Sequence, residues 1–118
     1  MTTLSAAELQ QKIKNGEAIS ELALDGLDLQ GCDLSGGIFQ EVSFTGANLR
    51  DAKLHETLFT ECTLDQATLS GAHLEQTVFN QCELNNIHVR ETTLKECVFN
   101  QCALSGSDFS HSALLSTQ

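Results

Sequence analysis

The sequence contains no tryptophan, tyrosine or proline, and aromatic residues make up only 5% of its 118 residues. Its interior is therefore expected to be narrow and built from leucine, phenylalanine and small side chains. Basic residues are also scarce: six Lys and Arg stand against sixteen Asp and Glu, for a formal net charge of −10. This charge disfavours direct binding to nucleic acid, because contacts with phosphates need a basic surface.

Several signals of location and chemistry are missing as well. No apolar run is long enough to span a membrane, and the first residues do not read as a secretory signal, so a cytoplasmic protein is expected. The five cysteines include no C-x-x-C pair, which argues against a disulfide framework or a zinc site. G-x-S-x-G, H-E-x-x-H, Walker and dinucleotide-binding motifs are absent, so we expect no enzymatic activity and no cofactor.

Apolar residues recur at every fifth position. The nineteen positions from Leu24 to Leu114 are all Leu, Phe or Val, and all six Phe lie among them. We call each of these positions a centre. Two residues before each centre the side chain is small or apolar, and all five cysteines fall there. Six of the eight glycines lie two residues after a centre, where we expect a corner with tight or positive φ.

A five-residue period fits neither a helix, in which the centres drift around the axis, nor a flat strand, in which they alternate between faces. It fits short extended sides that point the centre inward and are joined by corners. A longer period of 20 residues shows that four sides make one coil, so the chain forms fewer than five coils. This period is marked by Phe39, Phe59, Phe79 and Phe99, which are expected to stack as a core ladder about 4.8 Å apart.

Segments such as ANLRD (47–51), ATLSG (67–71) and CDLSG (32–36) resemble the A-(D/N)-L-x-x consensus of the pentapeptide-repeat family. The resemblance covers roughly residues 22–115. It implies an all-β fold, a right-handed quadrilateral parallel β-helix, and says little about function. We expect residues 1–20 to form an N-terminal helical cap, 21–115 the β-helix and 116–118 a C-terminal tail.

The cap is expected because the open end of a β-helix exposes apolar side chains and unpaired backbone. A short α-helix is predicted from Ser5 to Asn15. Ser5 and Glu8 have the spacing of a capping box, and Leu9 and Ile13 lie four residues apart on one face.

One outward position is apolar on a single side of the coil. The residue before each stacked Phe is aliphatic, and these residues are Ile38, Leu58, Val78 and Val98. We call this row the ridge. It predicts either a contact surface or only the preference of β-branched residues for strands. The polar rows beside it, at 40, 60, 80, 100 and 41, 61, 81, 101, could be amide ladders or a polar rim.

The potential metal ligands do not point to a site. His55, His73, His88 and His111 fall on outward positions of differing rungs, so no three ligands are expected to converge. Cys62, Cys82 and Cys102 stack on one side and are interpreted as small buried hydrophobes.

These observations favour a non-enzymatic scaffold that binds an unidentified protein through a rigid surface. A homodimer through the C-terminal coil or the ridge is a further expectation. By resemblance, the alternative is a DNA mimic that inhibits or protects a type II topoisomerase such as DNA gyrase. One side reads Asp28, Asn48, Thr68, His88, Asp108, which is not a continuous acidic stripe.

Overall fold

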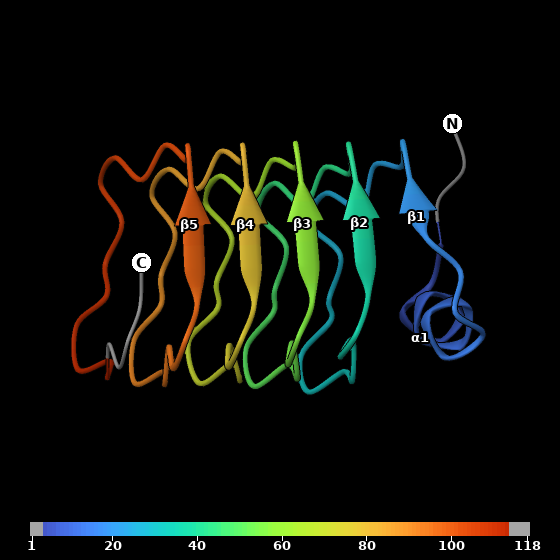
Figure 1. The fold of residues 1–118 in the computed structure, drawn as a ribbon, viewed down its shortest axis with the longest axis horizontal. Helices are drawn as coiled ribbons and strands as arrows, with labels where there is room; N and C mark the ends of the chain where they lie inside the picture. The colour runs from blue at the N-terminus through green and yellow to red at the C-terminus, as the bar shows by residue number, and fades with distance from the viewer. Residues whose placement is uncertain (1–3, 114–118) are drawn as a thin grey trace.

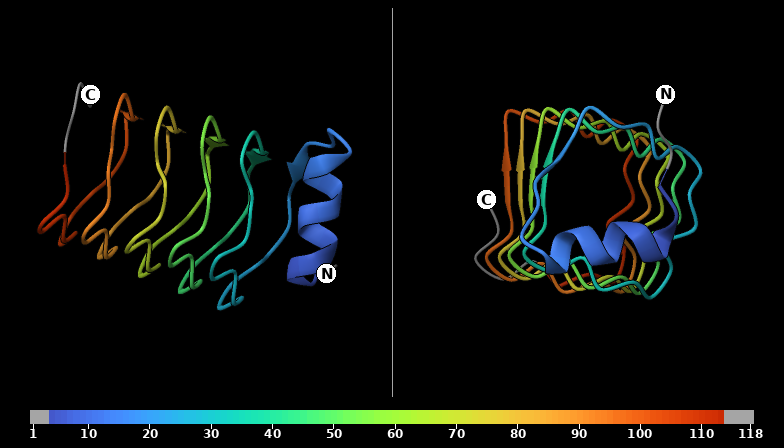
Figure 2. Two further views of the ribbon diagram at one scale, coloured as in Figure 1. Left: turned by 90° about the horizontal axis from the view of Figure 1, so that it is seen from below. Right: turned by 90° about the vertical axis from the view of Figure 1, so that its right-hand side faces the viewer.

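The protein is a right-handed, four-sided coil with a helix over its N-terminal end (Figures 1 and 2). The computed structural model describes residues 4–113, with overall dimensions of 34 × 23 × 23 Å. Five strands form one parallel sheet in sequence order. The elements are α1 (Ala6–Lys14), β1 (Ile19–Ser20), β2 (Ile38–Gln40), β3 (Leu58–Thr60), β4 (Val78–Asn80) and β5 (Val98–Asn100).

The 20-residue coil predicted from the sequence is confirmed by the pairing on all four walls, where a wall is a stack of equivalent sides. In the sheet wall, Phe39 pairs with Phe59. The other three walls are joined by single parallel bridges between residues 20 apart, such as Ser43↔Thr63, Asn48↔Thr68 and Lys53↔His73. β1 extends this pattern toward the N-terminus, because Ile19 pairs with Phe39. The sheet thus begins two residues before the expected boundary at residue 21.

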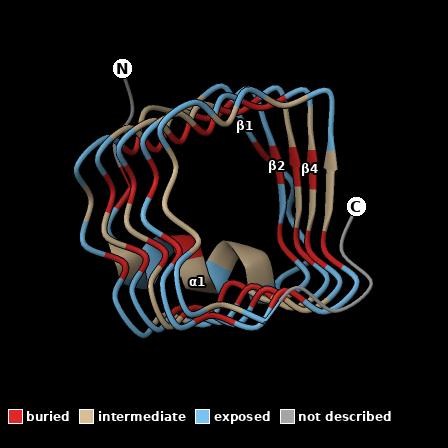
Figure 3. Cartoon of the chain, turned by 90° about the vertical axis from the view of Figure 1, so that its left-hand side faces the viewer, coloured by how far each residue is buried: buried red, intermediate tan, exposed pale blue. Residues whose placement is uncertain are grey.

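The core is a column of apolar side chains inside the square. Buried and more exposed segments alternate along the walls (Figure 3). The rings of Phe39, Phe59, Phe79 and Phe99 stack with centroids 4.9–5.1 Å apart and planes within 12° of parallel. Phe99 is only partly buried, because it lies in the last coil. The remaining centres to Leu94 are Leu, Phe or Val with at most 1% exposure.

The corners have an unusual backbone. Every described residue two positions after a centre has positive φ, for example Gly46 at 69° and Gln66 at 63°. Twelve such residues are not glycine, and Glu21, two positions after Ile19, also has positive φ. Left-handed backbone costs an L-residue about 1–2 kcal/mol. The non-glycine corners are therefore strained, and the register between neighbouring coils holds them in this conformation.

The expected capping helix is present as α1. The Glu8 amide donates to Ser5 Oγ at 3.2 Å, and the Ser5 amide donates to Glu8 Oε1 at 3.0 Å. Leu9 is fully buried against the first coil, and Leu4 and Ile13 pack beside it. The helix therefore covers the apolar centres that the first coil would otherwise expose.

Two features expected near the C-terminus lie beyond the part of the chain that the structure describes. They are Leu114, the last expected centre, and the expected tail at 116–118. Over residues 4–113, α1 is too short and too polar to cross a bilayer.

Candidate interaction surface

The ridge lies on the sheet wall, which faces the viewer in Figure 1. Its members are cross-strand partners: Ile38 pairs with Leu58, Leu58 with Val78, and Val78 with Val98. Ile38 is 47% exposed and is the most exposed large apolar side chain among the described residues. The other three are half-buried. The ridge is thus a continuous apolar strip that is most accessible at its N-terminal end.

Amide side chains beside the ridge form ladders between coils. Asn100 Nδ2 donates to Asn80 Oδ1 at 3.0 Å, and Gln81 Nε2 donates to Gln101 Oε1 at 3.3 Å. The same side chains border the apolar strip and face solvent. The sequence left open whether these residues form amide ladders or a polar rim around the ridge. At these positions they do both, because the hydrogen-bonded amides also border the apolar strip.

The sheet wall also carries acidic residues in four of its five segments and no basic residue. Its five segments, 18–21, 36–41, 56–61, 76–81 and 96–101, contain no Lys, Arg or His. Exposed carboxylates occupy corners on both sides of the ridge, and they are Glu21, Glu41, Glu61, Glu56 and Glu96. The signal was available in the sequence as glutamates spaced 20 residues apart at corner positions.

The stacked cysteines point inward and form hydrogen bonds between neighbouring coils. All five cysteines are free thiols. The Cys62, Cys82 and Cys102 thiols donate to backbone carbonyl oxygens of the preceding coil, as in the 3.3 Å contact from Cys82 Sγ to the Phe59 oxygen. Burial raises the pKa of the Cys97 thiol to about 12. A thiol held neutral in this way is a poor nucleophile and a poor metal ligand.

Two carboxyl groups with shifted pKa belong to turns. Hydrogen bonds from Ser35 lower the pKa of Asp33, and hydrogen bonds from Ser110 lower the pKa of Asp108. Each serine lies two residues after its aspartate, and its amide donates to the carboxylate at 2.9–3.1 Å. These shifts stabilise the ionised form in a local turn.

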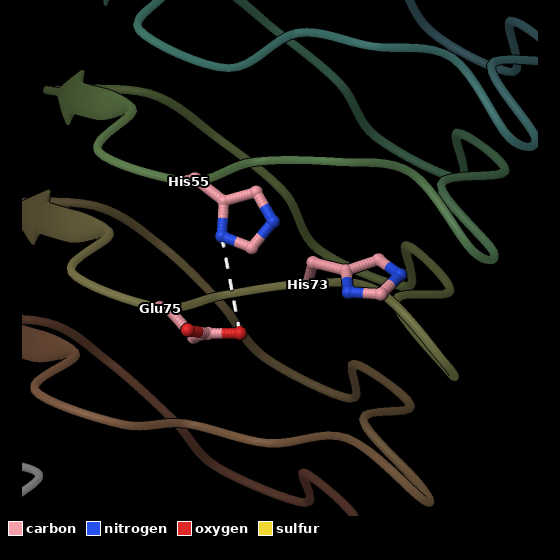
Figure 4. Close-up of side chains that lie close together, drawn as sticks. All are labelled: His55, His73 and Glu75. Atoms are coloured by element: carbon pink, nitrogen blue, oxygen red, sulfur yellow. Dashed lines mark ion pairs between the residues drawn. The ribbon is translucent and has the colours of Figure 1, made fainter.

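Three potential metal ligands lie together where the sequence analysis expected none to converge. His55, His73 and Glu75 place ligand atoms within 4.8 Å of one another (Figure 4). The expectation for the histidines is wrong at this place, because the third potential ligand is a carboxylate, Glu75, which lies in the coil after His55. The outward placement of the three side chains agrees with the sequence analysis, since His73 is exposed and the other two are half-buried.

Comparison with known sequences finds two overlapping matches. The pattern described as a pentapeptide repeat region matches residues 20–89. The pattern described as pentapeptide repeats in eight copies matches residues 82–114. No curated protein sequence matches the chain.

Solved structures with the same fold include proteins of different origin. One is trypsin-treated QnrB1 (R167E), a plasmid-mediated fluoroquinolone resistance protein, with a TM-score of 0.70 at 20% identity over 85% of this chain. The chain spans only 52% of that structure. Another is a pentapeptide repeat protein from the Arabidopsis thaliana thylakoid lumen, with a TM-score of 0.68 at 22% identity, covering 89% of this chain and 69% of that one. At these identities the likeness establishes the fold.

Proposed function

Because this chain belongs to the pentapeptide-repeat family, we propose that it is a non-enzymatic scaffold that presents its sheet wall to a protein partner. Pentapeptide-repeat proteins are generally structural or interaction modules. The observation that carries the proposal is the ridge, an apolar strip held in register by four strands and open to solvent at Ile38. A strip of this kind on a rigid surface suits contact with another protein.

The charges on the wall indicate the chemistry of the partner. Carboxylates stand on both sides of the ridge and no basic residue lies on the wall. A complementary surface has an apolar centre with Lys or Arg at its edges, since matched potentials speed association and exclude wrong partners. Binding should therefore weaken as salt is raised, because exposed charge pairs are screened.

The test is a pull-down from the native cell with wild type and an Ile38→Asp/Val78→Asp variant. Thr93→Asp is the matched control, because it adds the same type of charge at the equivalent outward position of another wall. A partner held by wild type and the control but lost by the ridge variant is the expected result. Circular dichroism must show that all three proteins are folded. If the ridge variant recovers the same partners as wild type, the ridge is not the interface.

A homodimer through the ridge is tested by light scattering on the same three purified proteins. If the ridge joins two copies, the doubly substituted variant becomes a monomer while the control stays dimeric. A dimer that survives both substitutions uses another surface, such as the C-terminal coil.

We also propose a cytoplasmic location. It is supported by the five free thiols, since disulfides form and persist mainly in oxidising compartments.

A second candidate is action on a type II topoisomerase as a DNA mimic. It is favoured by the net charge of −10 and by the fold shared with QnrB1, a fluoroquinolone resistance protein. It ranks second because Asn48, Thr68 and His88 interrupt the column between Asp28 and Asp108, and because the coil is at most 34 Å long. A gyrase supercoiling assay with micromolar protein separates the two candidates. Absence of both inhibition and protection removes this one.

A further inference from the structure

The cluster of His55, His73 and Glu75 lies on a different wall from the ridge (Figure 4). His55 Nδ1 and Glu75 Oε1 are 4.0 Å apart. The two imidazole rings have centroids 5.4 Å apart and planes inclined by 44°. The three side chains therefore turn their polar atoms toward one region of the surface.

The repeat explains why these residues meet. His73 and Glu75 flank the inward-pointing Leu74, so both face outward from the same side. His55 lies 20 residues before Glu75 and occupies the equivalent position in the preceding coil. Backbone hydrogen bonds hold the two coils together on both sides of the cluster, from the Leu54 amide to the His73 oxygen at 2.9 Å and from the Glu56 amide to the Glu75 oxygen at 3.1 Å. The ligand-bearing backbone is thus rigid before any ion arrives.

We propose that His55, His73 and Glu75 form a surface site for a borderline divalent transition-metal ion such as Zn²⁺. Two imidazoles and one carboxylate are a protein ligand set that Zn²⁺ accepts, with a fourth position left open to solvent or to a partner's side chain. Imidazole nitrogen disfavours hard ions such as Mg²⁺ and Ca²⁺, which take oxygen ligands.

The distances fit an empty site that closes by small side-chain movements. Ligand atoms bonded tetrahedrally to zinc at about 2.0–2.1 Å lie roughly 3.3 Å from each other. The His55–Glu75 pair must therefore approach by under about 1 Å from its 4.0 Å separation. The side chains of His55 and Glu75 are 37% and 45% exposed, which leaves both free to rotate and open to an ion.

The surrounding charges are mixed. Lys53 pairs through its backbone with His73, and Lys95 lies one coil after Glu75, so both oppose a cation. Asp51 and Glu56 occupy the corners of this wall in the same coil as His55 and offset the lysines. The overall charge of −10 further favours cation binding.

The experiment is calorimetric titration of ZnCl₂ into metal-free protein that carries no histidine tag, with a reducing phosphine present. The expected result is saturable binding of one Zn²⁺ per chain, weakened at least about tenfold in His73→Gln and Glu75→Gln. His88→Gln is the matched control, because His88 is an exposed outward histidine on another wall. It should bind like wild type. Excess MgCl₂ should not compete.

NMR identifies which histidines bind the ion, independently of the affinity measured by calorimetry. On addition of Zn²⁺, the ring signals of His55 and His73 should shift together while those of His88 and His111 stay in place. Equal zinc affinity in wild type, His73→Gln and Glu75→Gln would overturn the proposal, as would the absence of saturable binding. Displacement of zinc by Mg²⁺ would also overturn it, since it would indicate only a diffuse acidic surface.

Discussion

The side-chain hydroxyl of Thr57 donates a hydrogen bond of 3.0 Å to the carbonyl oxygen of Leu34, one coil earlier and inside the square. The same reach over 23 residues joins Cys82 to Phe59 and the Ser107 hydroxyl to the Leu84 oxygen. Polar residues are therefore tolerated at this inward position because the preceding coil offers each of them an acceptor. Within residues 4–113, every buried side-chain nitrogen and oxygen has a hydrogen-bond partner.

Replacing Thr57 with Val should lower the free energy of unfolding by about 1 kcal/mol, the net contribution of one such bond. The loss is modest because the Leu34 oxygen keeps a second bond, from the Gly37 amide at 3.0 Å. Urea denaturation followed by circular dichroism measures it. Thr93→Val, at an exposed outward position, is the control and should change stability by under about 0.5 kcal/mol. Equal effects at the two positions would show that the buried bond contributes nothing.

Truncating Phe79 to Ala should cost about 3–5 kcal/mol through lost burial and a cavity. Its ring is fully buried between those of Phe59 and Phe99, at 4.9 and 5.1 Å. Phe99→Ala should cost less, because Phe99 is only partly buried. Thermal and urea melts of both variants test this order. A loss below about 1 kcal/mol for Phe79→Ala would be incompatible with its place in the stack.

Substitutions at two corners should act in opposite directions. Gly46 has a φ of 69° and open space where a Cβ would lie, so Gly46→Ala should cost about 1 kcal/mol through backbone strain alone. Gln66 has a φ of 63°, and Gln66→Gly should raise stability by up to about 1 kcal/mol, less the extra chain entropy of glycine. Melting temperatures of the two variants provide the measurement. The same sign for both would contradict a strained corner.

Stability should fall in alkaline solution partly because of Cys97. Its thiol is held neutral by burial, which raises its pKa from 9.0 to about 12. Above pH 9 the unfolded thiol releases its proton while the folded one keeps it, so the unfolded state is favoured as pH rises toward 12. The slope from this group approaches, at most, about 1.4 kcal/mol per pH unit.

Urea denaturation of wild type and Cys97→Ala at pH 8, 9.5 and 10.5 isolates that contribution. The variant should lose less stability than wild type between pH 9 and 10.5, even if it is less stable at pH 8. Parallel pH profiles would mean that the Cys97 thiol ionises equally in the folded and unfolded states.

Much of the architecture could be predicted because a five-residue period at the centres permits few solutions. The stacking of Phe39 on Phe59 follows from that period and a 20-residue recurrence, without knowledge of any side-chain conformation. The capping helix followed from local chemistry at Ser5 and Glu8. The strained corners were only half anticipated: glycine marks a positive φ in sequence, whereas Gln66 does not, and its backbone is imposed by the coils on either side.

The coil, its four walls and the inward-facing residues follow from the amino-acid sequence alone, because they depend on periodicity and on the burial of apolar side chains. Contacts between side chains of neighbouring coils become visible only in the folded protein. The tertiary structure brought His55 to within reach of Glu75, gave Thr57 an acceptor at Leu34, and left Ile38 more exposed than the rest of the ridge. The 20-residue period places such residues in neighbouring coils, but side-chain rotamers decide which of them come into contact, and hydrophobic periodicity carries no information on rotamers.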